Sequence, residues 1–415
     1  MPFVISGEIP SFTNALFETI SGFTTTGASI LSDVESMSHG MMLWRCFTHW
    51  IGGMGVLVFL LAIIPMNSAS GSNMNLMKAE SPGPSVGKLV PRLKHTARIL
   101  YVIYFGMTVL EVIFLMFGHM SLFDALCTAF GTAGTGGFGI KNDSFGSFSP
   151  YIQWVVTVFM ILFGVNFNFY YFVLFRNIRK ALSMEEVRTY LLIILGAITI
   201  ITLSLMQTMA NIGDAIRHAA FQVASIITTT GYASADFDQW SQTCKTVLVI
   251  LMFVGACAGS TGGGMKVSRL VIMFKTVVKE LSSYFHPKNI KKINMDGKPV
   301  EHEVVRAVNV YFITLMGIFT LSVFLVSLEG RDLVTNFTAV ASCLNNIEPG
   351  LSEVGPTRNF GGLTGFTKYV LMFDMLAGRL ELFPLLLIFN PGVYRDMIMG
   401  AWRGIKRRRQ ERRAN

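Results

Sequence analysis

Residues 13–29 read Thr-Asn-Ala-Leu-Phe-Glu-Thr-Ile-Ser-Gly-Phe-Thr-Thr-Thr-Gly-Ala-Ser. A short apolar segment is followed directly by a threonine- and glycine-rich stretch that runs from Thr24 to Gly27. The apolar part is too short to cross a bilayer, which takes about 20 helical residues. Irregular backbone at membrane depth is tolerated only where it is buried in protein or lines water. The stretch therefore predicts a re-entrant half-helix of about 10–14 residues with a non-helical loop at its end.

The same unit recurs three more times along the chain. The later stretches are Ala133–Phe138, Thr228–Ala233 and Asn345–Gly350. Aligned on their fourth residues, Gly27, Gly136, Gly231 and Glu348, the stretches stand 109, 95 and 117 residues apart. Each interval has room for a span down, a loop, a span up and the next half-helix.

Acidic residues open three of the short segments, namely Asp124, Asp214 and Asp332. A carboxylate at a helix N-terminus accepts hydrogen bonds from free N–H groups and suits the positive end of the dipole. Their position supports reading these segments as separate half-helices.

The composition indicates a membrane protein. Hydrophobic residues make up 52% of the chain and charged residues 14%, whereas soluble domains carry about 25% charged residues. Long apolar runs account for this difference, at 99–117, 154–175, 190–206, 304–328 and 369–389. A multi-spanning helical protein is therefore predicted, in preference to a large soluble protein with a buried core.

The net charge of +9 is concentrated in a few places. Of the 34 Lys and Arg residues, 26 fall in four stretches that hold only nine acids: 78–98, 176–188, 266–306 and 395–413. Basic loops remain on the cytoplasmic side of a membrane, so these stretches and the basic C-terminus are predicted to be cytoplasmic. Because topology explains the charge, nucleic-acid binding is disfavoured.

The four loops suggest a pore for a cation. A ring of backbone carbonyls can replace the hydration shell of an ion, and glycine permits the backbone angles that aim successive carbonyls the same way. The predicted filter residues are Thr24, Thr25, Thr26 and Gly27; Gly134, Thr135 and Gly136; Thr228, Thr229, Thr230 and Gly231; and Asn345, Asn346, Ile347 and Glu348.

Two further features lie inside apolar runs. Five glycines in the eleven residues Val254–Gly264 are incompatible with a good continuous helix. Arg379 lies in the last apolar run, and an intramembrane arginine is functional by default, with a partner to be found. Candidate partners are Asp374, Glu381 and the carbonyls of the glycine-rich break. For the glycine-rich break, the alternative to a functional role is an ordinary hinge. For Arg379, the alternative is a buried ion pair with Glu381.

The chain resembles the Trk/Ktr/HKT superfamily of K⁺ transporters, and is most similar to the bacterial Trk membrane subunits. The resemblance covers essentially the whole chain, from the first threonine stretch to Gly378-Arg379-Leu380-Glu381. The other motifs that carry it are Trp50–Gly55, Lys78–Pro84, Cys257–Lys266 and Cys343–Asn346.

This resemblance implies an all-α membrane protein with four parallel span–half-helix–span repeats around a central pore. It implies a K⁺ filter, a homodimer, a cytosolic nucleotide-binding regulatory subunit and a location in the bacterial cytoplasmic membrane. It also implies an intramembrane gate, made of Ala258, Gly259, Ser260, Thr261, Gly262, Gly263, Gly264 and a pore-facing Arg379. The predicted divisions are repeat 1 at 1–96, repeat 2 at 97–186, repeat 3 at 187–303 with the gate at 254–264, repeat 4 at 304–401, and a basic tail at 402–415.

The sequence departs from the family pattern in two places. The first repeat begins at its half-helix, without its leading span, as expected of a fragment, a shortened gene model or a natural variant. Glu348 stands where the other stretches have glycine. Either its carboxylate alters selectivity or conductance, or Gly350 or a local rearrangement restores the loop.

Channel-like K⁺ uptake is the predicted function, and a carrier that couples K⁺ or Na⁺ to H⁺ or Na⁺ is the alternative. No His, Cys and Asp constellation, nucleophile motif or cofactor fingerprint suggests an enzyme. K⁺ enters the prediction as the transported ion, and no other cofactor is expected.

Overall fold

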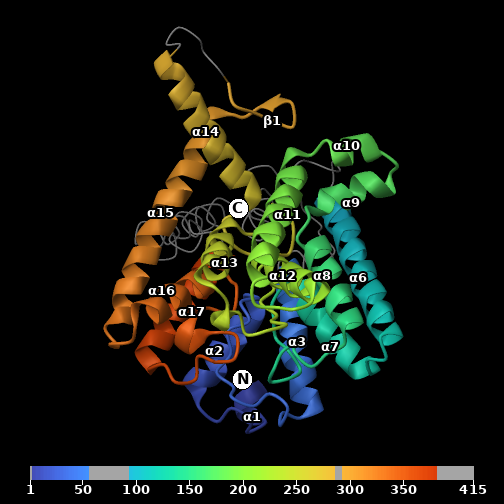
Figure 1. The fold of residues 1–415 in the computed structure, drawn as a ribbon, viewed down its shortest axis with the longest axis vertical. Coiled ribbons are helices and arrows are strands. Elements are labelled where there is room, and N and C mark those ends of the chain that lie inside the picture. Colours follow the sequence, from blue (N-terminus) through green and yellow to red (C-terminus); the bar gives the residue numbers. More distant parts are fainter. Residues whose placement is uncertain (1, 56–92, 286–291, 381–415) are drawn as a thin grey trace, which may run out of the picture.

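A computed structural model describes residues 2–55, 93–285 and 292–380. Within these residues the regular secondary structure is helical apart from one antiparallel hairpin, formed by β1 (Asn294–Met295) and β2 (Lys298–Pro299). The motif at 78–84, Glu381 and the basic tail at 402–415 lie outside the described residues. Figure 1 shows the hairpin and helix α14 (Val267–Phe285) at one end of the molecule and the N-terminus near the other.

Half-helices form at all four of the predicted places. They are α2 (Phe12–Phe23), α7 (Leu122–Gly134), α12 (Ile212–Ile227) and α16 (Leu333–Leu344). Three have 12 or 13 residues, as expected, while α12 has 16. All four are well short of the bilayer thickness.

Capping at the half-helix N-termini differs from the predicted pattern in detail. Asp332 is itself a cap, and its carboxylate accepts a hydrogen bond from the Thr335 N–H at 3.0 Å. The Thr335 hydroxyl also donates to this carboxylate, which lowers the pKa of Asp332. Asp124 lies in the first turn, where Ser121 is the cap. Asp214 likewise lies in the first turn of α12, which Asn211 caps.

Three of the described helices are long and apolar enough to cross a membrane. They are α6 (Leu93–Phe117), α11 (Glu185–Leu205) and α15 (His302–Ser327). Only 28–33% of each apolar window is buried inside the protein. Large apolar side chains such as Phe105, Leu192 and Ile313 are exposed. These surfaces are suited to contact with lipid, as expected of an integral membrane protein.

A helix of 13–16 residues follows each loop and ends beside the half-helix of its own or a neighbouring repeat. These helices are α3 (His39–Met54), α8 (Pro150–Phe163), α13 (Gln242–Val254) and α17 (Gly365–Arg379). The apolar run at 154–175 is not one continuous helix, because α8 bends by 91° into α9 (Phe167–Leu174). Asn166 caps α9, its side chain accepting from the Asn168 N–H at 2.9 Å, so the backbone freed by the bend is partly satisfied.

The remaining elements are short. They are α1 (Pro2–Ile5), α10 (Ile178–Leu182) and the 3₁₀ turns η1 (Phe237–Gln239) and η2 (Ser352–Val354).

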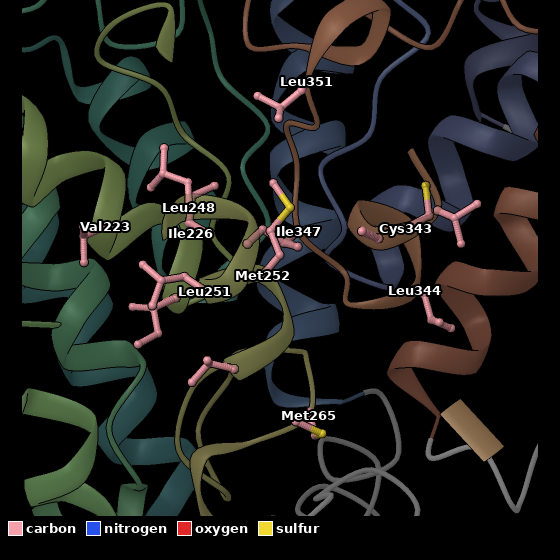
Figure 2. Packing of buried hydrophobic residues seen from close by; sticks show 14 of the residues in the cluster. Val223, Ile226, Leu248, Leu251, Met252, Met265, Cys343, Leu344, Ile347 and Leu351 are labelled. Carbon is pink, nitrogen blue, oxygen red and sulfur yellow. The ribbon is translucent and has the colours of Figure 1, made fainter. Parts of the chain in front are cut away.

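The largest apolar core surrounds half-helices α12 and α16. Figure 2 shows side chains of α12, α13 and α16 close together, among them Ile226, Met252 and Leu344, with Ile347 of the fourth loop beside them. The buried faces of the half-helices carry small residues such as Ala219 and Ala339, which let the neighbouring helices approach closely.

Candidate functional site

The four half-helices end in the same backbone motif. The N–H of Thr25 donates to the Gly22 oxygen and the N–H of Thr26 to the Ser21 oxygen, at 3.2 and 3.0 Å. Equivalent pairs of bonds close α7, α12 and α16. This is the Schellman arrangement, whose central residue is left-handed and is usually glycine.

Here the left-handed residue is not glycine in any of the four loops. The residues and their φ angles are Thr25 (54°), Thr135 (52°), Thr229 (59°) and Asn346 (53°). A β-branched side chain in this region is an outlier, and each such residue costs about 1–3 kcal/mol. Strain of this kind persists where the surroundings over-determine it, commonly at functional sites.

The structure corrects the register of the second loop by one residue. Positive φ angles occur again at Gly27 (87°), Gly137 (84°) and Gly231 (91°). Gly137, and not Gly136, is therefore the equivalent of Gly27. The sequence pattern places the start of the second stretch at Ala133, but α7 continues to Gly134. The four-residue loops are thus 24–27, 134–137, 228–231 and 345–348, named loops 1 to 4 below.

Glu348 occupies the glycine position of loop 4 without a positive φ. Glu348 thus avoids the positive φ that a non-glycine residue is expected to resist. Loop 4 accommodates glutamate through a backbone that differs at this residue from the other three loops.

The four loops form a closed ring in chain order. The Gly136 carbonyl fills the space that a Cβ on Gly27 would need, and the Thr230 carbonyl does the same at Gly137. The Glu348 carbonyl packs in this way against Gly231. Asn346 of loop 4 completes the circle, because its Nδ2 donates to Thr26 Oγ1 of loop 1 at 3.0 Å.

Glycines of the neighbouring helices let backbone pack against the ring. A Cβ on Gly53 of α3 would lie 2.6 Å from Gly134 Cα, and Gly378 of α17 abuts the Leu344 carbonyl. The Asn346 side chain also donates to the Met375 carbonyl of α17 at 2.8 Å. The glycine motifs of the sequence therefore mark where α3 and α17 support the loops.

A polar cavity of about 120 Å³ opens at one side of the ring. The fourth residues of all four loops line it, together with Arg45, Lys141 and Arg358. Of the lining side chains that the structure describes, Glu348 is the one acid.

Asp33 and Glu35 lie beside this cavity and tie together the segments that follow loops 1 and 2. Asn142 Nδ2 donates to Asp33 at 2.9 Å, and the Asn142 N–H donates to Glu35 at 3.0 Å. The bond from the Asn142 side chain lowers the pKa of Asp33.

Arg45 and Glu18 form a buried ion pair that was not predicted from the sequence. Arg45 Nε lies 2.7 Å from Glu18 Oε1, and both side chains are almost fully buried. Arg45 also donates to Ser29 Oγ and to the Gly139 carbonyl, both at 3.2 Å, and so connects the segments that leave loops 1 and 2. A usable signal was present, because two opposite charges in neighbouring apolar segments commonly pair within a membrane.

The glycine-rich break lies against the opposite side of the ring. It runs from Gly255 to Lys266, between α13 and α14, and is called the break loop below. The Gly263 N–H donates to Thr229 Oγ1 at 2.6 Å. Positions for a Cβ on Gly262 and Gly263 lie 2.8 Å from the Thr228 oxygen and 2.7 Å from the Asn345 oxygen. The break loop therefore contacts the first residues of loops 3 and 4, while the cavity opens at the fourth.

Basic side chains bond to the carbonyls of the break loop. Arg379 Nη1 donates to the Thr261 carbonyl at 3.0 Å, and Nη2 donates to the Gly52 carbonyl. Lys266 Nζ donates to the Gly262 carbonyl. Of the three partners predicted for Arg379, the described residues thus include a contact with a break-loop carbonyl. Asp374 instead accepts from Ser322 Oγ at 2.7 Å.

Four short half-helices whose loops meet in a closed ring, together with long apolar helices that expose large apolar side chains, are typical of an integral membrane protein of the transport class. The family described as "TrkH: Cation transport protein" matches residues 2–398. The chain belongs to this TrkH family of cation transport proteins, as the sequence predicts, and the family is one of transporters and not of enzymes.

Individual relatives and a solved structure agree with this assignment. The Trk system potassium uptake protein TrkH of Salmonella typhimurium is 35% identical over 95% of this chain and 82% of that protein. TrkH of Escherichia coli K12 is 34% identical with the same coverage. The crystal structure of the potassium transporter TrkH from Vibrio parahaemolyticus matches with a TM-score of 0.81 and 32% identity, over 92% of this chain and 79% of that one.

Proposed function

We propose that this chain takes up K⁺ across the cytoplasmic membrane through a pore lined by loops 1 to 4. The observation that carries the proposal is the closed ring, in which four similar loops meet in chain order. The names of its relatives, which describe potassium uptake, support the choice of ion.

The proposed filter is made of backbone oxygens from residues 24–27, 134–137, 228–231 and 345–348. A dehydrated K⁺ needs a shell of oxygens from several sides, and a single chain can supply it only if its repeats surround one axis. The C-terminal end of each half-helix meets the ring, and this end carries a partial negative charge that favours a cation.

The break loop is the proposed gate. Its residues Ala258 to Gly264 lie across the ring from the open cavity, in contact with loops 3 and 4. Arg379 adds a positive charge beside this contact, which would oppose the passage of a cation while the break loop stays in place.

A coupled carrier is the less favoured mechanism. Carriers of that kind are commonly built on inverted repeats that rock around a midplane site. The four loops here instead repeat in the same sense around the ring, as a channel-like filter requires.

The hairpin end of the molecule is proposed to face the cytosol, because residues 266–306 form one of the four basic stretches. A nucleotide-binding regulatory subunit would dock at this end, and two copies of the chain would pair in the membrane. The family resemblance supports both of these proposals.

Complementation tests the proposed function directly. A bacterium that lacks its own K⁺ uptake systems should grow in low-K⁺ medium when it expresses this chain, and should take up rubidium as a K⁺ substitute. Failure to grow despite folded protein in the membrane would contradict the proposal.

Glu348→Gly is expected to weaken K⁺ uptake when external K⁺ is low. The change removes the one acid that the structure describes among the lining side chains and leaves Arg45, Lys141 and Arg358. The KM for K⁺ should rise by a factor of a few, and less at high ionic strength, because the field at a charged mouth is screened by salt. Parallel uptake assays with K⁺ and Na⁺ measure both affinity and selectivity.

Glu348→Gln is the matched control, since it removes the charge and keeps most of the side chain. Equal shifts in the two variants assign the effect to charge. Unchanged uptake of both ions in Glu348→Gly would show that the Glu348 carboxylate affects neither conductance nor selectivity.

Arg379→Ala is expected to raise basal K⁺ flux roughly tenfold. The change removes charge-assisted bonds to the Thr261 and Gly52 carbonyls, each of which is worth about 1.5–3 kcal/mol. Rubidium efflux from proteoliposomes is the measurement, with Arg379→Lys as the variant that keeps the charge. A folding defect without raised flux would show that Arg379 has a structural role instead.

A further inference from the structure

Glu186, in the first turn of α11, is a buried carboxylate that touches both ends of the break loop. Its side chain is 4% exposed. One oxygen, Oε1, accepts from the Ala258 N–H at 2.6 Å and from the Ser268 N–H at 3.1 Å. Ala258 lies near the start of the break loop and Ser268 just after its end. A single side chain from another helix therefore bridges the two flanks of the loop.

The bend between α8 and α9 supports the break loop from a second direction. Asn166, at the bend, donates from Nδ2 to Glu186 Oε2 at 3.3 Å. The Phe167 N–H donates to the Gly259 carbonyl, and the Cys257 N–H donates to the Gly164 carbonyl, both at 3.0 Å. The backbone groups freed where α8 ends thus bond to the break loop, and Glu186 closes the cluster.

The residue before Glu186 connects this cluster to the hairpin. The Glu185 N–H donates to Asp296 Oδ1, in the turn of the hairpin, at 2.7 Å. The Glu185 carboxylate lies 2.5 Å from Lys275 Nζ of α14, and Lys275 also donates to the Asn294 carbonyl at 2.7 Å. The hairpin therefore holds the N-terminus of α11 one residue away from the carboxylate that holds the break loop.

A cavity of about 720 Å³ lies between these two sets of contacts. Asn166 and Glu186 line it beside the break loop, and Asp296 and Lys298 line it from the hairpin. The hairpin and α14 project at this end of the molecule (Figure 1). The first turn of α11 is thus placed between an accessible surface and the break loop.

We propose that Glu186 is a latch that keeps the break loop beneath loops 3 and 4, and that the hairpin cluster of Glu185, Lys275 and Asp296 sets the position of this latch. The proposal rests on the proposed role of the break loop as the gate. Bonds from backbone N–H groups to a buried carboxylate are strong, and both are lost together when the first turn of α11 moves. A small displacement of the hairpin by a bound partner thereby releases both flanks of the loop.

Glu186 is a positioning residue, since it contacts the break loop and not the ring. Glu186→Ala and Glu186→Gln should raise basal rubidium flux in proteoliposomes about tenfold, as expected when a charge-assisted bond is lost from the closed state alone. The ratio of K⁺ to Na⁺ flux should stay unchanged, because the ring is untouched. Glu303→Gln is the matched control, since it neutralises an acid at the same end of the protein, in the first turn of α15.

Cys257 offers a readout that is independent of flux. It is a buried free cysteine of the break loop, so release of the latch should speed its labelling by a thiol reagent severalfold in the Glu186 variants. Labelling of Cys257→Ala gives the background from the other cysteines.

Where Glu186→Ala does not fold, Asp296→Ala leaves the buried carboxylate in place and removes its outer support. Raised flux and faster labelling in Asp296→Ala support the latch, and wild-type values overturn it.

The deletion of Ala258–Gly262 separates this proposal from the one on which it rests. Raised flux in the deletion, with Glu186 variants that match Glu303→Gln in flux and labelling, would overturn the latch alone. Wild-type flux in the deletion would overturn the gate and the latch together.

Discussion

Gly231→Ala is expected to reduce K⁺ uptake to background while the protein stays folded. Gly231 has a φ of +91°, and the Glu348 carbonyl of loop 4 fills the space that a Cβ would need. Alanine would therefore strain the backbone of loop 3 and push two adjacent loops apart. The strain costs about 1–2 kcal/mol of stability, which a folded protein can absorb. A ring of ion-coordinating oxygens tolerates much less displacement.

Growth in low K⁺ and rubidium uptake measure this effect, with membrane abundance and thermal stability measured in parallel. Gly317→Ala is the matched control, because Gly317 lies within α15 and a Cβ there meets nothing within 4 Å. That variant should retain wild-type uptake and gain slightly in helix stability. Wild-type uptake in Gly231→Ala would mean that the contact between loops 3 and 4 is not part of the ion path.

Deletion of Ala258–Gly262 is expected to give a constitutive leak. The deletion removes the Thr261 and Gly262 carbonyls that Arg379 and Lys266 hold, and with Gly262 it removes the contact with the Thr228 carbonyl of loop 3. Basal rubidium flux should rise at least tenfold, since the closed state loses several charge-assisted bonds. Selectivity for K⁺ over Na⁺ should persist, because residues 228–231 and 345–348 remain.

A second substitution identifies the route of the leak. Combining the deletion with Gly231→Ala should bring the flux back to background if the ions pass through the ring. A leak that survives Gly231→Ala would indicate another path, and unchanged flux in the deletion alone would exclude the break loop as a gate.

The repeated half-helices and the break at Val254–Gly264 could be predicted from sequence, because each is a local pattern. A short apolar segment before Thr24 or Thr228 cannot span a bilayer, and glycines clustered inside a long apolar run interrupt a helix. The membrane class and the family could be predicted for the same reason.

The sequence was insufficient where the decisive contact is between distant residues. Gly136 was aligned with Gly27 because residue type alone does not reveal where α7 ends. The 91° bend after Phe163 was missed, since the backbone groups it frees bond to the break loop about 90 residues later in the chain. Asn346 joins loop 1 across 320 residues, and Glu186 reaches Ala258 across 72. Such pairings depend on how the folded chain packs around the ring, which a local sequence pattern does not show.

The threonines at left-handed positions were also beyond sequence reasoning. Thr25, Thr135 and Thr229 occupy a left-handed conformation that glycine usually takes, so glycine preference alone does not locate these residues. Strain at the same position of loops 1, 2 and 3 indicates that the threonine side chains there matter. Thr229 Oγ1, for example, accepts from the break loop.

A crystal soaked with rubidium or thallium shows directly whether ions bind inside the ring of loops 1 to 4, because anomalous scattering locates these K⁺ substitutes without any assumption about the protein. We expect anomalous peaks on the axis enclosed by loops 1 to 4, between the Glu348 end and the break loop. Peaks confined to other parts of the protein, with none inside the ring at saturating ion, would contradict this expectation.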